Sequence, residues 1–293
     1  MLIFKNIDKA LMTEIDKNDF ALLQESKKNL SASNLSHTNL DGIDFSFGNF
    51  ISTNFKESSL NNVNFTSAKL DSADFTKAKL NGANFNSAKL FKTILFQAKL
   101  SKAIFVESDL MGANLSATDL SGANLSRCSL VEANLIDSNL TGANLKEAKL
   151  VGRFTREGYF SRGANLTRCI LKGADLSMAD CHGADIPDSD IQDANLSNTN
   201  LIEADLRRAN LRGANLTGAK LSEANLRKTN LAGANFKDAS LAETKLTGVD
   251  LSQVLNLSPE EITLAVIDKK TKIPDYLEIV WISDETHDCK ARL

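Results

Sequence analysis

Residues 112–135 read GANLSATDLSGANLSRCSLVEANL, with a leucine at every fifth position. The same spacing runs from Leu30 to Leu150, where every fifth residue is Leu or Phe, and resumes one register later from Leu166 to Leu251 with few exceptions. A period of five fits neither an α-helix, which repeats every 3.6 residues, nor a continuous strand, which repeats every two. Each unit is therefore expected to be a short extended piece followed by a turn.

Two positions of each unit are expected to face inward. The residue two before the large apolar one is nearly always small, as in Ala113-Asn114-Leu115 and Ala123-Asn124-Leu125. Residues two apart on an extended chain point to the same side, so the small and the large side chains share the core and the Asn between them faces solvent. The two remaining positions hold Ser, Thr, Gly, Lys or Glu and suit a corner.

A longer repeat sets the number of sides. Phe45, Phe65, Phe85 and Phe105 recur every twenty residues, which is four units of five. The pattern therefore predicts an all-β solenoid with four-sided coils that stack on one another.

This A(N/D)LXX pattern resembles the pentapeptide-repeat family over about three-quarters of the chain, most nearly its cyanobacterial-type members and more distantly the Qnr proteins. The resemblance implies a right-handed quadrilateral β-helix. It identifies a scaffold and leaves the function open.

The composition excludes several classes of function. The chain has 293 residues and a net charge of −3, with its charges spread along the sequence. A dense basic face is needed for strong phosphate-backbone binding, so direct nucleic-acid binding is not expected. No apolar stretch near the N-terminus is long enough for a signal peptide or a membrane span, which predicts a cytoplasmic protein that does not enter membranes.

Solenoid ends expose core, so caps are expected at both. At the C-terminal end, Ser258 reads as a helix N-cap, Pro259 as the first helical residue and Glu261 as the partner that closes a capping box. The sequence thus predicts an N-terminal helical cap over 1–26, a β-helix over 27–150, a loop insertion over 151–163, a second β-helical part over 164–252, and a C-terminal helical cap or tail over 253–293.

The C-terminal tail has two interpretations. In Qnr relatives a C-terminal helix pairs two rods into a dimer, and the tail here could form a homodimer in the same way. The alternative is a cap folded on its own chain. Either role would use Leu264, Ile267, Tyr276 and Trp281.

No catalytic, cofactor-binding or metal-binding residues are predicted, and the protein is not expected to be an enzyme. Of the three His, His37 and His182 fall on outward or corner positions far apart in the rod, and no Cys/His cluster has metal-ligand spacing. Cys128, Cys169 and Cys181 fall on inward positions and are expected to be buried reduced thiols, whereas Cys289 in the tail could be exposed.

One corner column is apolar. The residue just after the large apolar position is Phe91, Met111, Val131 and Val151 in four successive coils, and these side chains are expected to line up outward. Large exposed apolar patches often mark interfaces. The expected partner-binding set comprises this column, Ile94 and Phe96 beside it, and Phe154, Arg156, Tyr159 and Phe160 in the insertion. The alternative is that the insertion folds back and covers the column.

Charges form columns in the second half. Glu203, Glu223 and Glu243 make one, and Arg207 and Arg208 are followed twenty residues later by Arg227 and Lys228 in the next. The simplest interpretation is that the two columns neutralise each other as solvated salt bridges. Phosphate binding by the cations is the alternative.

These patterns together favour a non-catalytic protein-protein interaction scaffold whose partner the sequence does not name. The alternative is a regulator or protector of a DNA-binding enzyme such as DNA gyrase through partial DNA mimicry, as the likeness to Qnr proteins implies. The near-neutral rod and its many lysines depart from that pattern.

Overall fold

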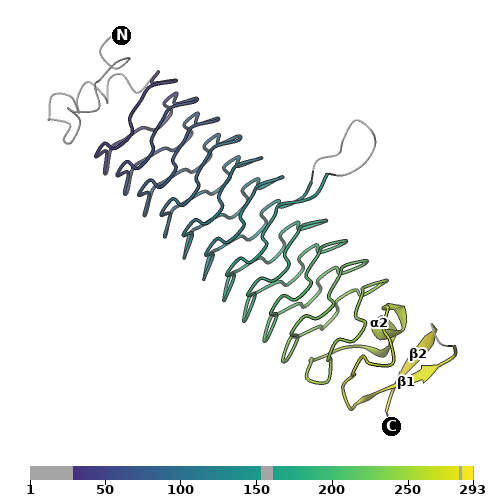
Figure 1. Cartoon of the computed structure of the whole chain (residues 1–293). Helices are drawn as coiled ribbons and strands as arrows, with labels where there is room; N and C mark the ends of the chain where they lie inside the picture. Colours follow the sequence, from purple (N-terminus) through teal and green to yellow (C-terminus); the bar gives the residue numbers. More distant parts are fainter. Residues whose placement is uncertain (1–28, 153–160, 284–285, 293) are drawn as a thin grey trace.

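The protein winds as a four-sided β-solenoid. The computed structural model describes residues 29–152, 161–283 and 286–292, and Figure 1 shows the coils stacked along one axis. Along most of the rod an outward wall residue pairs in parallel with the residue twenty positions on, as Asn54 does with Asp74. Each side is so short that one residue per side forms the bridge. The prediction of a β-solenoid with four five-residue sides is confirmed.

The corners explain why the repeat needs two tolerant positions. The N–H of Ala68 donates to the carbonyl of Phe65 at 3.0 Å, which closes a turn over two residues. The second of these, Ser67, has a φ of 56°, and a positive angle at this place is typical of a type II turn. The N–H of Ser67 then donates to the Asn86 carbonyl of the next coil at 2.9 Å. This corner is thus bonded both within its coil and to its neighbour, and most other corners repeat both bonds.

The core is filled by the large and small inward positions, as predicted. In the N-terminal half phenylalanines stack along the axis, with the ring centroids of Phe85 and Phe105 4.7 Å apart and their planes 3° from parallel. Where a hydroxyl replaces the small residue it is satisfied by the backbone, since Thr53 Oγ1 donates to the Leu30 carbonyl at 2.8 Å. Cys128, Cys169 and Cys181 are buried and free, and burial raises the pKa of the latter two to about 12.

The insertion interrupts one coil without disturbing the stacking. Asn134 pairs with Asn165 at a separation of 31 residues in place of twenty, and the N–H of Ala164 donates to the Leu150 carbonyl at 2.7 Å. The two legs of the insertion lie in close contact, because a Cβ on Gly152 would lie 1.6 Å from the Ser161 carbonyl oxygen. This coil therefore has eleven residues more than an ordinary one, and its described ends, Gly152 and Ser161, lie next to each other.

The C-terminal end differs from the expected helical cap. Its helix α2 spans only Pro259–Leu264, and a hairpin of strands β1 (Leu277–Trp281) and β2 (His287–Ala291) follows it. Figure 1 shows these elements at the end of the rod. Wall pairing also continues past the predicted boundary at 252, as far as Asp250 with Lys272. The N-terminal cap predicted over 1–26 lies outside the described residues.

Ser258 does cap α2, since its side chain accepts a hydrogen bond from the Glu261 N–H. The predicted capping box is wrong in its second half, because the Glu261 carboxylate accepts from the Leu241 N–H at 2.6 Å. The tail is joined to the last coils by this contact. Cys289 is buried, with 7% of its surface exposed, which corrects the expectation that it could be exposed.

Candidate partner-binding surface

The predicted apolar column is aligned along one edge of the rod. The N–H of the residue after Phe91 donates to the Met111 carbonyl at 2.9 Å, and the next two steps, to Val131 and Val151, are made in the same way at 2.8 and 3.3 Å. We call these four residues the apolar stripe. Because the backbone bonds fix the register, the four side chains occupy equivalent corners of successive coils.

The stripe is less exposed than the sequence suggested. All four of its side chains are half-buried, and the Lys92 ammonium lies 5.2 Å from the centroid of the Phe91 ring, close enough for a cation–π contact. Ile94, on the adjoining wall, is 37% exposed between Asp74 and Asn114. Phe96 is half-buried at the next corner, across that wall from the stripe.

The stripe ends where the insertion begins. Val151 and Gly152 form the outgoing leg, and Ser161 on the returning leg donates to Glu132 Oε1 at 2.6 Å, beside the stripe. The four insertion residues predicted to bind a partner, Phe154, Arg156, Tyr159 and Phe160, lie outside the described residues.

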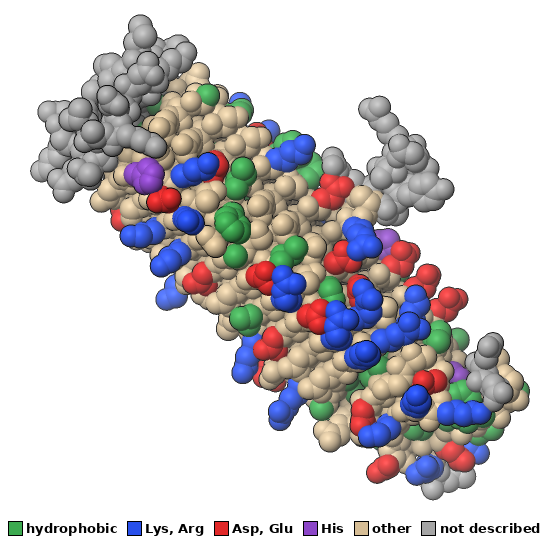
Figure 2. Space-filling model, viewed as in Figure 1, with side chains coloured by type: hydrophobic (Ala, Val, Ile, Leu, Met, Phe, Trp, Pro, Cys, Tyr) green, Lys and Arg blue, Asp and Glu red, His purple; other side chains and the backbone are tan. Residues whose placement is uncertain are grey.

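A polar groove of about 350 Å³, which the repeat pattern does not predict, lies just beyond the insertion. Arg162 Nη1 lies 3.2 Å from Asp185 Oδ2 in this groove, and His182 Nε2 lies 3.5 Å from Glu203 Oε1. A signal was available in the sequence, since the Glu203 column starts two coils after Gly163, where the insertion ends. Figure 2 shows charged side chains most crowded toward the C-terminal half of the visible face.

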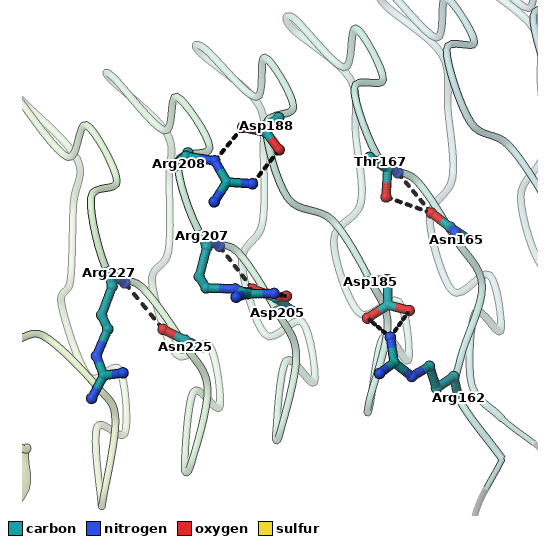
Figure 3. Close-up of polar contacts among 10 residues, drawn as sticks. All are labelled: Arg162, Asn165, Thr167, Asp185, Asp188, Asp205, Arg207, Arg208, Asn225 and Arg227. Carbon is teal, nitrogen blue, oxygen red and sulfur yellow. Dashed lines mark hydrogen bonds and ion pairs between the residues drawn. The ribbon is translucent and has the colours of Figure 1, made fainter.

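The charge columns are paired differently from the prediction. Arg207 forks onto Asp205 within its own unit, with Nη2 2.6 Å from Oδ2, and Arg208 forks onto Asp188 of the preceding coil at 2.5 and 2.6 Å (Figure 3). The expected bridges to the Glu203 column are therefore wrong, because that column lies at the opposite corner of the same wall.

These ion pairs perturb the carboxylates. The hydrogen bond from the Arg208 guanidinium lowers the pKa of Asp188 below its usual range. Burial by itself raises the pKa of Asp205, but bonds from the side chain and backbone of Arg207 outweigh it and the net direction is down. Both carboxylates are thus held in the charged form.

The four residues proposed for the tail do not form one open surface. Leu264 and Tyr276 are 55% and 45% exposed, whereas Ile267 is buried and Trp281 is half-buried against the core. The Tyr276 hydroxyl accepts a hydrogen bond from the Leu257 N–H at 3.0 Å. Three of the four side chains therefore make contacts within the chain, whereas that of Leu264 is mostly exposed.

Within residues 29–152, 161–283 and 286–292, no three His, Cys, Asp or Glu side chains are grouped so that they could hold a metal ion. Among the helices of that same part of the chain, none has the length and apolar character needed to cross a bilayer.

Solved structures of similar proteins are known. The first is HetL of the cyanobacterium Nostoc sp. strain PCC 7120, a pentapeptide repeat protein involved in the regulation of heterocyst differentiation; it is 29% identical over 78% of this chain and 95% of its own, with a TM-score of 0.31. Rfr23 of Cyanothece 51142 is 32% identical over 48% of this chain and 90% of its own, with a TM-score of 0.21. Trypsin-treated QnrB1, a plasmid-mediated fluoroquinolone resistance protein, is 21% identical over 69% and 90%, with a TM-score of 0.43.

A comparison with curated proteins finds no match. The family model of pentapeptide repeats matches in overlapping segments over residues 29–152 and 162–255. These segments coincide with the two stretches in which the described walls carry the five-residue unit. The chain therefore belongs to the pentapeptide-repeat family.

Proposed function

We propose that the protein is a non-catalytic, cytoplasmic interaction scaffold that binds a protein partner through the apolar stripe, Ile94 and the insertion. The observation that carries the proposal is the alignment of four apolar side chains on one corner, ending at the base of the insertion. A rigid scaffold holds such side chains in fixed positions, so little ordering entropy is lost on binding.

The stripe is tested by replacing Phe91 and Met111 with Ser. A partner captured from lysate by the unaltered protein should no longer bind the double variant. The circular dichroism spectrum and melting temperature should be retained, because both side chains are only half-buried. Ile51→Ser is the matched control, since Ile51 occupies the same corner two coils before Phe91 and is also half-buried. Undiminished binding by the double variant would contradict the proposal.

The insertion is tested separately by deleting residues 152–162. This deletion removes the predicted contacts of Phe154, Arg156, Tyr159 and Phe160 and leaves the stripe in place. Weaker binding is expected if the insertion contacts the partner. Stronger binding would favour the alternative in which the insertion covers the stripe.

Two finer expectations belong with this proposal. A homodimer through the tail predicts a doubled solution mass by light scattering, reduced to that of the monomer by Leu264→Ser. Protection of DNA gyrase predicts retained supercoiling when a fluoroquinolone is added together with the protein. A scaffold with a different partner gives no protection in that assay.

A further inference from the structure

A ladder of alternating charge follows one corner of the rod. Arg168 forks onto Asp137 across the insertion at 2.6 and 2.8 Å, and two coils after Arg168 the side chain of Arg208 forks onto Asp188. Arg168 and Asp188 occupy successive coils, because Asn165 pairs with Asp185 in the same register. Each guanidinium in this ladder thus has a carboxylate from the coil before it.

The alternation stops one coil further on. Lys228 takes the place that follows Arg208, so two cations are adjacent where the pattern would put a carboxylate. Asn225 likewise takes the place of Asp205, so Arg227 lacks the fork that holds Arg207 (Figure 3).

Three cations are consequently left without an acidic partner among the described residues. The Arg227 side chain donates to Thr247 Oγ1 at 3.0 Å, and Lys245 continues the wall position of Asn225. We call Arg227, Lys228 and Lys245 the basic patch; all three are exposed.

The nearby aspartates are already engaged. Asp188 and Asp205 hold Arg208 and Arg207, as described above. Asp250 pairs with Lys272 at 2.9 Å, and Asp268 accepts a hydrogen bond from the Gly248 N–H at 2.8 Å. Glu223 lines the polar groove together with Lys245 but forms no ion pair with it, and the Glu203 column to which Glu223 and Glu243 belong lies at the corner of that wall away from Arg227 and Lys228.

We propose that the basic patch binds an acidic segment of a partner protein, whose Asp or Glu carboxylates occupy the places left by the missing acidic partners. The preceding coil indicates the chemistry of the ligand. There Asp205 occupies the position equivalent to Asn225, and its carboxylate makes a bidentate contact with Arg207. The planar guanidinium of Arg matches a carboxylate with two parallel hydrogen bonds, which gives the contact a specific geometry as well as charge attraction. This inference rests on the proposed function in one respect: the ligand of the basic patch is taken to be a protein because the proposed function is protein binding.

The test is fluorescence anisotropy of the full chain with a labelled twelve-residue peptide of alternating Asp and Gly, at about 50 mM salt so that surface charges are weakly screened. Arg227→Gln with Lys228→Gln should weaken binding at least about fivefold, since two charge-assisted contacts are removed. Lys89→Gln with Lys149→Gln is the matched control: it removes the same charge from a wall position on another side and should leave the affinity unchanged.

A reciprocal pair of variants provides a sharper test. Asn225→Asp should supply the missing carboxylate within the chain and weaken peptide binding although no cation is removed. Asp205→Asn should release Arg207 and strengthen it. Both changes are nearly isosteric, so circular dichroism should be the same for the two proteins.

Three results would overturn the proposal: no peptide binding, equal loss in the Lys89/Lys149 control, or displacement of the peptide by inorganic phosphate or a twelve-nucleotide single strand at equal charge concentration. The apolar-stripe variant Phe91→Ser/Met111→Ser should retain peptide binding. A result that contradicts the proposal for the basic patch is therefore distinguishable from one that contradicts the proposal for the apolar stripe.

Discussion

At the scale of the residue, the outward Asn or Asp of each unit has two bonding roles. Asn64 donates through Nδ2 to Asp44 Oδ1 of the preceding coil at 2.9 Å, and its own Oδ1 accepts from the Thr66 N–H at 3.1 Å. The first contact joins coils and the second shapes the corner as an Asx turn. This double role explains in physical terms why a solvent-facing position is so restricted in composition.

The inward positions differ in the volume they can hold. Leu125 is fully buried and Ala123 is 1% exposed in the same unit. Leu125→Ala should lower the free energy of unfolding by roughly 2–5 kcal/mol through the cavity it leaves. Ala123→Leu should cost about 1–3 kcal/mol because the wall is already filled. Urea unfolding measures both, and two neutral results would contradict the inward assignment.

The left-handed corner position gives a prediction of opposite sign. Ala117 has a φ of 57° at an exposed corner, where an L side chain costs roughly 1–2 kcal/mol. Ala117→Gly should therefore raise stability by about 0.5–1 kcal/mol after the entropy of the freer unfolded chain is subtracted.

Gly122→Ala is the control for Ala117→Gly. Gly122 has a φ of 63°, and its nearest neighbour, Lys102 Cγ, lies 3.7 Å from an added Cβ, so the change tests backbone angle without a clash. It should lower the melting temperature. A rise would mean that these corners do not favour glycine.

At the scale of the element, the sequence predicted those features that depend on contacts between residues close together in the chain. Ser258 and Pro259 begin α2 as expected, since an N-cap acts within one turn. The use of Glu261 was missed because its partner, Leu241, is twenty residues away in sequence and is brought close only by the coil. The hairpin β1–β2 was also missed, because its segments carry no five-residue repeat.

The insertion can be removed in register. Deleting residues 152–162 leaves Val151-Gly163-Ala164-Asn165 between Leu150 and Leu166, which is one ordinary unit. The shortened chain should keep its β circular dichroism and melt at the same temperature or higher, because a loop-closure cost is removed.

Deleting one residue fewer, 153–162, is the control for register. Gly152 then remains as an extra residue, and the following side chains are shifted by one position. A shift of one position reverses which side chains face the core. This variant should melt at a lower temperature than the in-register deletion. Equal melting temperatures would mean that the number of residues between Leu150 and Leu166 does not set the register.

At the scale of the whole molecule, the fold was largely predictable and the binding surfaces were not. The fold follows from short-range rules applied many times, so the twenty-residue spacing of the phenylalanines was enough to set four sides. The right-handed winding that the family resemblance implies stays a prediction, because side-chain spacing is the same for either hand. The pairing of Arg207 with Asp205 depended on side-chain reach across a corner, which spacing alone does not give.

The stability of the rod should fall in acid. Hydrogen bonds from Ser252 and Lys272 lower the pKa of Asp250 to about 2, and arginines lower those of Asp137 and Asp188. A carboxylate with a lowered folded pKa stabilises the protein at pH above its unfolded pKa, near 3.9, and the benefit is lost as pH falls toward the folded value. The melting temperature should therefore be steady from pH 7 to about 4.5 and drop below about 4.

Asp250→Asn isolates one contributor to this pH dependence. The variant should melt below the parent at neutral pH, and the two should converge as the pH approaches 2. A gap that stayed constant with pH would show that the carboxylate charge is not the source of the difference.

The pairing of each coil with its neighbours at a separation of twenty residues also determines how the rod would respond to a pull on its ends. Detaching one coil frees twenty residues, or roughly 70 Å of extended chain. The coil that carries the insertion frees 31 residues, or roughly 110 Å. A force–extension record would then show a regular sawtooth with one longer tooth near the middle, and the position of that tooth would reveal from which end the rod unravels.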